Sequence, residues 1–171
     1  MFKITTYHLV YISFIATILS CSPKPDKRPS PLTMDSVMLN GNKVKITYSS
    51  PSVRKRKIWG DLVPYGEVWR TGANEATYLK TETDIKINNQ DIPKGEYAIF
   101  TIPTDSTWTV ILNKEWNQWG SYNYDSTLDI LRQKVIPVKK SFTEQMKFKL
   151  DQDSIYFRWE NLGYSLSISK N

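Results

Sequence analysis

Histidine and cysteine are almost absent from this chain of 171 residues, which contains only His8 and Cys21, both near the N-terminus. Ser-His-Asp triads, Cys-His nucleophiles and histidine-ligated zinc or copper sites all need these side chains. If the N-terminal segment is removed after export, the remaining chain acting alone cannot build any of them. We therefore expect no metal centre, no cofactor and little familiar catalytic chemistry.

The first twenty residues have the pattern of an export signal. Lys3 provides a positive start, and Leu9 to Leu19 form an apolar run too short to span a bilayer. A small residue then precedes Cys21, and this ending resembles a bacterial lipobox. The resemblance implies that residues 1–20 are removed and that Cys21 is acylated, so that it anchors the protein to a membrane. The alternative is an ordinary secretory signal with a chance cysteine near its end.

A proline-rich spacer is expected at residues 21–33, which hold four of the nine prolines. Such a segment cannot bury apolar surface and favours extended conformations. It would join the lipid to one domain, residues 34–171. After processing, the net charge is 22 − 17 = +5. No acidic run follows Cys21, which favours the periplasmic face of the outer membrane over the cell surface, and an exported protein is not expected to bind nucleic acid.

Apolar and polar residues alternate through most of this domain, as in half-buried β-strands. Residues 97–100 are apolar on both faces, which predicts a central strand. Three alternating runs near the C-terminus, separated by turns at 151–153 and 161–163, predict a β-meander. Residues 125–134 fit either a short capped helix or a strand, and we favour the strand. About eight or nine antiparallel strands predict an all-β, single-domain β-sandwich.

A long irregular segment rich in tryptophan and glycine carries a family resemblance. Residues 59–76, together with 94–103 and 108–113, are similar to the domain of unknown function 2911 family. The likeness continues at 119–122 and 131–132 and covers the whole domain. It implies a secreted or lipid-anchored envelope protein of a Gram-negative bacterium, with no established activity. It supplies no catalytic residue.

Two carboxylates near the aromatic segment suggest a catalytic alternative. Glycosidases need two facing carboxyl groups, one of them protonated in apolar surroundings. Glu67 and Glu75 lie among Tyr65, Trp69 and Arg70 and are the best candidate pair. The favoured interpretation is structural: Glu67 is a solvated turn residue and Glu75 is a partner of Arg70.

Arg70 is the most informative charge in the chain because aromatic and glycine-rich sequence surrounds it. Its planar guanidinium could bind a carboxylate or phosphate while stacking on a ring. We favour a salt bridge with Glu75 or Asp61 that ties down the long loop. The basic run Arg54 to Lys57 could attract anionic lipid or polyanionic glycans, and we favour a solvated loop.

A second aromatic segment spans residues 116–124 and includes Trp116, Trp119, Tyr122 and Tyr124. Such rings either form a platform for sugars or plug the open end of a sandwich, and we favour the plug. The leading hypothesis is a non-catalytic, lipid-anchored domain that binds a ligand, a glycan or an envelope protein. The alternatives are a carboxylate-dependent glycan hydrolase and a purely structural envelope component. The predicted binding residues are Tyr65, Trp69, Arg70, Asn74, Trp116, Trp119 and Tyr122.

Overall fold

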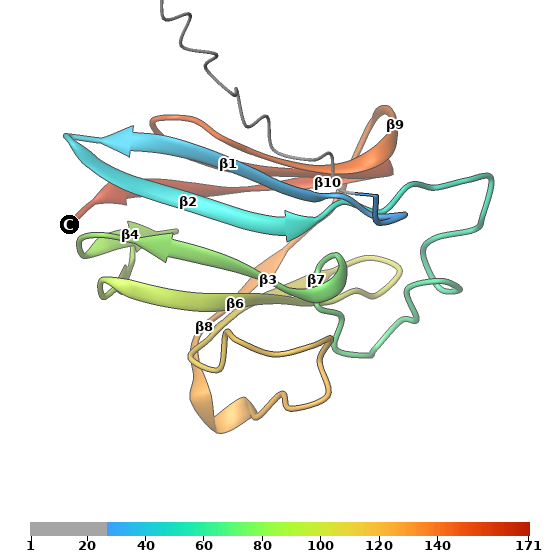
Figure 1. The fold of residues 1–171 in the computed structure, drawn as a ribbon, viewed down its shortest axis with the longest axis horizontal. Helices are drawn as coiled ribbons and strands as arrows, with labels where there is room; N and C mark the ends of the chain where they lie inside the picture. Colours follow the sequence, from blue (N-terminus) through green and yellow to red (C-terminus); the bar gives the residue numbers. More distant parts are fainter. Residues whose placement is uncertain (1–26) are drawn as a thin grey trace, which may run out of the picture.

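The computed structural model describes residues 27–171, which fold into two antiparallel sheets, as Figure 1 shows. The all-β prediction is confirmed, and residues 27–171 form ten strands rather than eight or nine. The predicted export signal, His8 and Cys21 lie outside the described residues. Within residues 27–171, no helix has the length and apolar character needed to cross a membrane.

The larger sheet contains six strands in the order β1-β2-β3-β6-β7-β8. Their bounds are β1 Leu32–Leu39, β2 Asn42–Ser49, β3 Ala73–Thr81, β6 Gly95–Ile102, β7 Trp108–Asn113 and β8 Asp129–Val135. β6 pairs with β3 and β7 and is buried from Tyr97 to Thr101, which confirms the predicted central strand. β1 begins at Leu32, so the spacer expected to end at residue 33 overlaps the first strand by two residues.

The smaller sheet contains four strands in the order β5-β4-β10-β9. Their bounds are β4 Ile85–Ile87, β5 Gln90–Ile92, β9 Val138–Leu150 and β10 Ser154–Lys170. β4 and β5 form a hairpin whose two loop residues, Asn88 and Asn89, have φ angles of 46° and 65°. Two positive φ angles favour a type I′ turn, and asparagine tolerates them well.

The predicted C-terminal meander is wrong in one respect, because residues 161–163 do not reverse the chain. β10 runs through them as one strand, and the pairing with β9 shifts register on both sides of Glu160, which has a φ of 55°. The buried positions change from odd numbers, ending at Trp159, to even numbers, beginning at Tyr164. Glu160 pairs with Thr143 and Leu162 with Lys139, so the extra residues at these two irregularities lie in β9, opposite the point where the buried face of β10 changes.

Residues 125–135 combine the two alternatives that the sequence left open. Ser126–Leu128 form one turn of 3₁₀-helix, and the Asp125 carboxylate caps it by accepting the Thr127 N–H at 2.9 Å. β8 follows at once and pairs with β7. The favoured strand is confirmed from residue 129 onward.

A cluster of aromatic rings fills the space between the sheets near one end. The Trp59 and Trp108 rings lie 4.3 Å apart, and the Trp69 and Trp159 rings stack at 5.7 Å. Phe157 contacts several of these rings. Trp59 and Trp69 come from the long loop between β2 and β3, which extends beyond the strands at one end in Figure 1. The loop is therefore held to the sandwich by its own tryptophans.

Candidate functional site

The two predicted contact segments, residues 59–75 and 116–124, lie side by side. The Gly120 N–H donates to the Asn74 carbonyl oxygen at 3.0 Å, so the second segment runs along the start of β3. Asn74 has a φ of 57°, which is tolerated by asparagine better than by most residues. The structure therefore places aromatic residues from both segments near the same end of the larger sheet.

A recess of about 190 Å³ opens between β3 and the second segment, and we call it the Trp116 recess. The Trp116 and Tyr78 rings both line it, with centroids 5.0 Å apart and planes tilted by 45°. Ala76, which is buried, also lines it. The recess thus combines two aromatic faces with a small apolar residue.

Polar groups also reach this recess. Thr47 is buried, and its Oγ1 has no hydrogen-bond partner among residues 27–171. Glu75 lines the same recess, and its carboxylate accepts hydrogen bonds from Arg28 Nη1 at 2.8 and 3.0 Å and from Ser49 Oγ at 3.2 Å. The recess is therefore bordered by a carboxylate that two neighbours hold in place and by a threonine whose hydroxyl is buried without a partner in the described chain.

The loop that carries Trp116 is fixed by a buried side chain. Asn113, at the end of β7, is fully buried; its amide group donates to Asp125 O and to Asp129 Oδ1, both at 2.8 Å. Its oxygen accepts the Glu115 N–H at 2.8 Å. This network uses both N–H donors and one acceptor site of the amide to shape the turn. Trp116 is therefore presented by a rigid support.

The other aromatic residues of the second segment divide into two kinds. Tyr124 is half-buried and contacts the ring of Phe100 at 5.1 Å, in a small apolar cluster that is separate from the core between the sheets, so it covers the outer face of the larger sheet. Trp119 and Tyr122 are 58% and 85% exposed, so they plug nothing. Neither lines the Trp116 recess. Trp119 pairs with Glu75, which lines the recess, and the Tyr122 ring lies against Gly120.

Trp69 and Tyr65 have structural contacts. Trp69 is 9% exposed in the aromatic core, and its Nε1 donates to the Gly72 carbonyl at 3.1 Å. The Tyr65 ring lies against Gly60, where an added Cβ would come within 2.8 Å of Tyr65 Cε2. Gly60 also has a φ of 77°, so this contact needs glycine for two reasons.

The expected salt bridge of Arg70 with Glu75 or Asp61 is wrong: Glu75 pairs with Arg28 instead, and Asp61 forms no ion pair with Arg70 within residues 27–171. In the part of the chain that the structure describes, Arg70 has no ion pair, and its Nε is buried without an acceptor. Burial lowers the pKa of Arg70, an effect that nearby Tyr122 partly offsets. Arginine keeps its charge at neutral pH despite such a shift. This is an unpaired charge in a partly buried position.

The candidate catalytic pair lacks the surroundings that its chemistry needs. Glu67 and Glu75 are both exposed, and Glu75 is engaged by Arg28 and Ser49. A glycosidase acid is kept protonated by apolar surroundings. Within residues 27–171, no group of three or more histidine, cysteine, aspartate or glutamate side chains could hold a metal ion.

Sequence reasoning missed Tyr78 and Thr47, which complete the Trp116 recess. Tyr78 has a recognisable signal, since it is an aromatic residue on a strand that begins inside the tryptophan-rich segment. Thr47 has none, because only the pairing of β2 with β3 brings it opposite Tyr78.

Comparison with known proteins gives one informative result. No curated protein and no solved structure matches the chain. A family model does match, over most of its length and across both sheets. The chain belongs to the family described as "Protein of unknown function (DUF2911)", whose model matches residues 30–168.

Proposed function

We propose that this protein is a non-catalytic, lipid-anchored binding domain of the bacterial cell envelope, and that the Trp116 recess binds an envelope glycan. The observation that carries the proposal is the pairing of two aromatic walls, Trp116 and Tyr78, with the unpartnered hydroxyl of Thr47. Binding sites combine apolar surface with a few polar groups that fix orientation. This arrangement fits a sugar, which has a flat apolar face and a rim of hydroxyls.

Size and polarity support a small ligand group. The recess, at about 190 Å³, is below the roughly 300–1,000 Å³ typical of pockets for drug-sized ligands. It would hold one ring of a longer glycan. The Glu75 carboxylate can accept from sugar hydroxyls while Arg28 and Ser49 keep it in place. Exposed Trp119 and Tyr122 offer further rings for neighbouring units.

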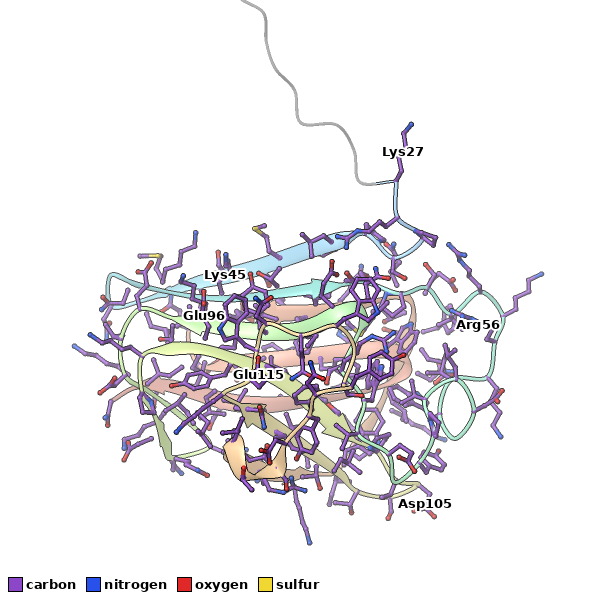
Figure 2. All side chains as sticks on the ribbon, turned by 60° about the horizontal axis from the view of Figure 1, so that its bottom comes forward. Lys27, Lys45, Arg56, Glu96, Asp105 and Glu115 are labelled. Carbon is purple, nitrogen blue, oxygen red and sulfur yellow. The ribbon has the colours of Figure 1, made fainter. Side chains whose placement is uncertain are left out.

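The path of the N-terminus supports membrane attachment. Arg54 Nη2 donates to the Pro29 carbonyl at 3.2 Å, so the start of the described chain lies against the basic loop 54–57. Figure 2 shows Lys27 and Arg56 toward the same end of the molecule, away from Lys45. All four residues of the basic loop are exposed. A lipid on Cys21 would bring these cations close to anionic head groups, which attract them.

Two measurements test this proposal. Mass spectrometry of the protein from its native cells should find an acylated Cys21 as the first residue. Saturation-transfer NMR of the full chain with soluble peptidoglycan fragments should show contact without new products. Release of a cleaved glycan, abolished by Glu67→Gln or Glu75→Gln, would instead establish the hydrolase. An unmodified Cys21 within an intact N-terminus would refute the lipid anchor.

A further inference from the structure

A second cavity, separate from the Trp116 recess, lies at the end of the sandwich under the loop between β2 and β3. We call it the Arg70 cavity, and its volume is about 180 Å³. Arg56 and Arg70 line it from the loop, Gly72 and Ala73 from the start of β3, and Trp159 from β10. It therefore lies where the two sheets meet the loop.

The charged side chains that line this cavity are all positive. Two arginines line it, and among the described residues no carboxylate does. Some cations elsewhere in residues 27–171 are neutralised by acidic partners, namely Arg28, Lys80, Lys86, Arg132 and Lys149. The acid that could have neutralised Arg70, Glu75, is occupied by Arg28. The cavity is consequently an electropositive hollow.

Arg56 is held in position by the backbone. Its Nε donates to the Val53 carbonyl at 3.1 Å and its Nη2 to the Ser52 carbonyl at 2.6 Å. A guanidinium has five N–H donors, so three remain for another acceptor. Arg54 and Lys55 have φ angles of 50° and 57° in the same loop. Such strain in residues other than glycine is kept where the surrounding structure enforces it, often at ligand sites.

Two buried donors of the cavity-lining residues lack acceptors. Arg70 Nε is one, and Trp159 Nε1, on a side chain only 1% exposed, is the other; neither has a partner within the described chain. A buried donor without a partner costs stability, and a charged one costs more. Burial also lowers the pKa of Arg70, because it disfavours the charged form of the guanidinium. The lowered pKa and the loss of stability therefore have the same cause. A hydrogen-bond acceptor that entered the cavity and reached these donors would remove this energetic cost.

We propose that the Arg70 cavity binds an oxyanion, namely the carboxylate or phosphate group of a soluble molecule or of a lipid head group. Paired guanidinium groups match the geometry of such groups and form short, charge-assisted hydrogen bonds with them. The volume suits one anionic group rather than a whole ligand. The proposal is independent of glycan binding, since Arg56 and Arg70 do not line the Trp116 recess.

The test is an NMR titration of the isotope-labelled full chain at constant ionic strength. Inorganic phosphate and acetate should shift the Arg70 Nε–H and Trp159 indole N–H signals until the site is saturated. Arg70→Gln and Arg56→Gln should each weaken phosphate binding at least about tenfold. Lys57→Gln, in the same loop but outside the cavity, should change it less than about twofold, and so should Trp116→Ala.

A second set of experiments identifies the source of the anion. Vesicles of phosphatidylcholine alone are compared with vesicles that also contain phosphatidylglycerol. If the protein is retained on the anionic vesicles and this retention depends on Arg70 and Arg56, the bound anion is a lipid head group. If the protein binds only free phosphate or acetate, the bound anion is a soluble molecule. The proposal is overturned if none of these probes gives a saturable shift, or if Lys57→Gln weakens binding as much as the cavity variants. Because Arg56 is exposed, we expect Arg56→Gln to fold. The phosphate titration of this variant therefore still tests the proposal if Arg70→Gln does not fold.

Discussion

Arg28 Nη1 contacts both carboxylate oxygens of Glu75, at 2.8 and 3.0 Å, and this pair determines the electrostatics of the neighbourhood. Glu75 lies five positions after Arg70 in the sequence and was its expected partner. Because Arg28 takes that role, Glu75 is held at the Trp116 recess, while Arg70 is left with a cavity that contains no acid. This ion pair therefore leaves a carboxylate at the Trp116 recess and only positively charged groups at the Arg70 cavity.

Glu75→Gln should have a small effect on stability. The side chains of Arg28 and Glu75 are 34% and 49% exposed, and ion pairs so exposed contribute no more than about 1 kcal/mol. We expect urea unfolding to show a loss within that limit, together with weaker glycan binding at the recess. A loss of several kcal/mol would show that the pair is a structural element, and our assignment of Glu75 to the recess would fail.

Arg70→Met should stabilise the protein. The substitution keeps much of the apolar stem and removes a partly buried charge that has no acidic partner within residues 27–171. We expect a gain of roughly 1 kcal/mol in the free energy of unfolding. The matched control is Arg132→Met, which breaks the 2.6 Å contact with Asp129 and should destabilise. Equal losses in both variants would mean that Arg70 has a structural partner.

Gly163→Ala should destabilise β10 where it pairs with the start of β9. A Cβ at this position would lie 2.5 Å from the Phe157 carbonyl oxygen, so the backbone must shift. Overpacking of this kind costs about 1–3 kcal/mol. Thermal unfolding should show a clear fall in Tm, whereas Ser165→Ala, at an exposed position of the same strand, should change little. A neutral Gly163→Ala would argue against the path of β10 as described.

Asp125→Ala should remove a stabilising interaction that depends on pH. Hydrogen bonds from the Thr127 backbone N–H and hydroxyl lower the pKa of Asp125 below its ordinary 3.8. A lowered folded-state pKa means that the stabilisation is present above 3.8 and is lost as the pH falls through the lowered value. The stability difference between wild type and variant should therefore shrink on acidification. Asp105→Ala, in an exposed turn, should show no comparable effect.

The sequence predicted the architecture better than the sites. Alternation identified the strands of the core, and the apolar run at 97–100 correctly indicated the centre of the sheet. It could not distinguish a turn from a continuous strand at residues 161–163, because the change of buried positions from odd to even numbers is compatible with both. The two predicted contact segments lie side by side in the structure, and the other residues that line the Trp116 recess depend on strand pairing. Thr47 meets Tyr78 only through the register of β2 and β3.

Charge partners were the least predictable feature. Arg70 and Glu75 are close in the sequence, and proximity favoured a pair between them. The actual partner, Arg28, lies 47 residues before Glu75 in a segment expected to be a spacer. Long-range ion pairs of this kind follow from the fold and leave no local signal. The unpaired state of Arg70 could therefore be recognised only in three dimensions.

Calorimetric titration of the full chain with soluble peptidoglycan fragments tests the binding proposal most directly. Trp116→Ala removes a wall of the recess, whereas Trp119→Ala removes an exposed ring outside its lining. We expect Trp116→Ala to weaken binding at least about tenfold, as loss of a central aromatic contact usually does, and Trp119→Ala to weaken it much less. Equal affinity for the wild type and Trp116→Ala, or no binding by the wild type, would contradict the account.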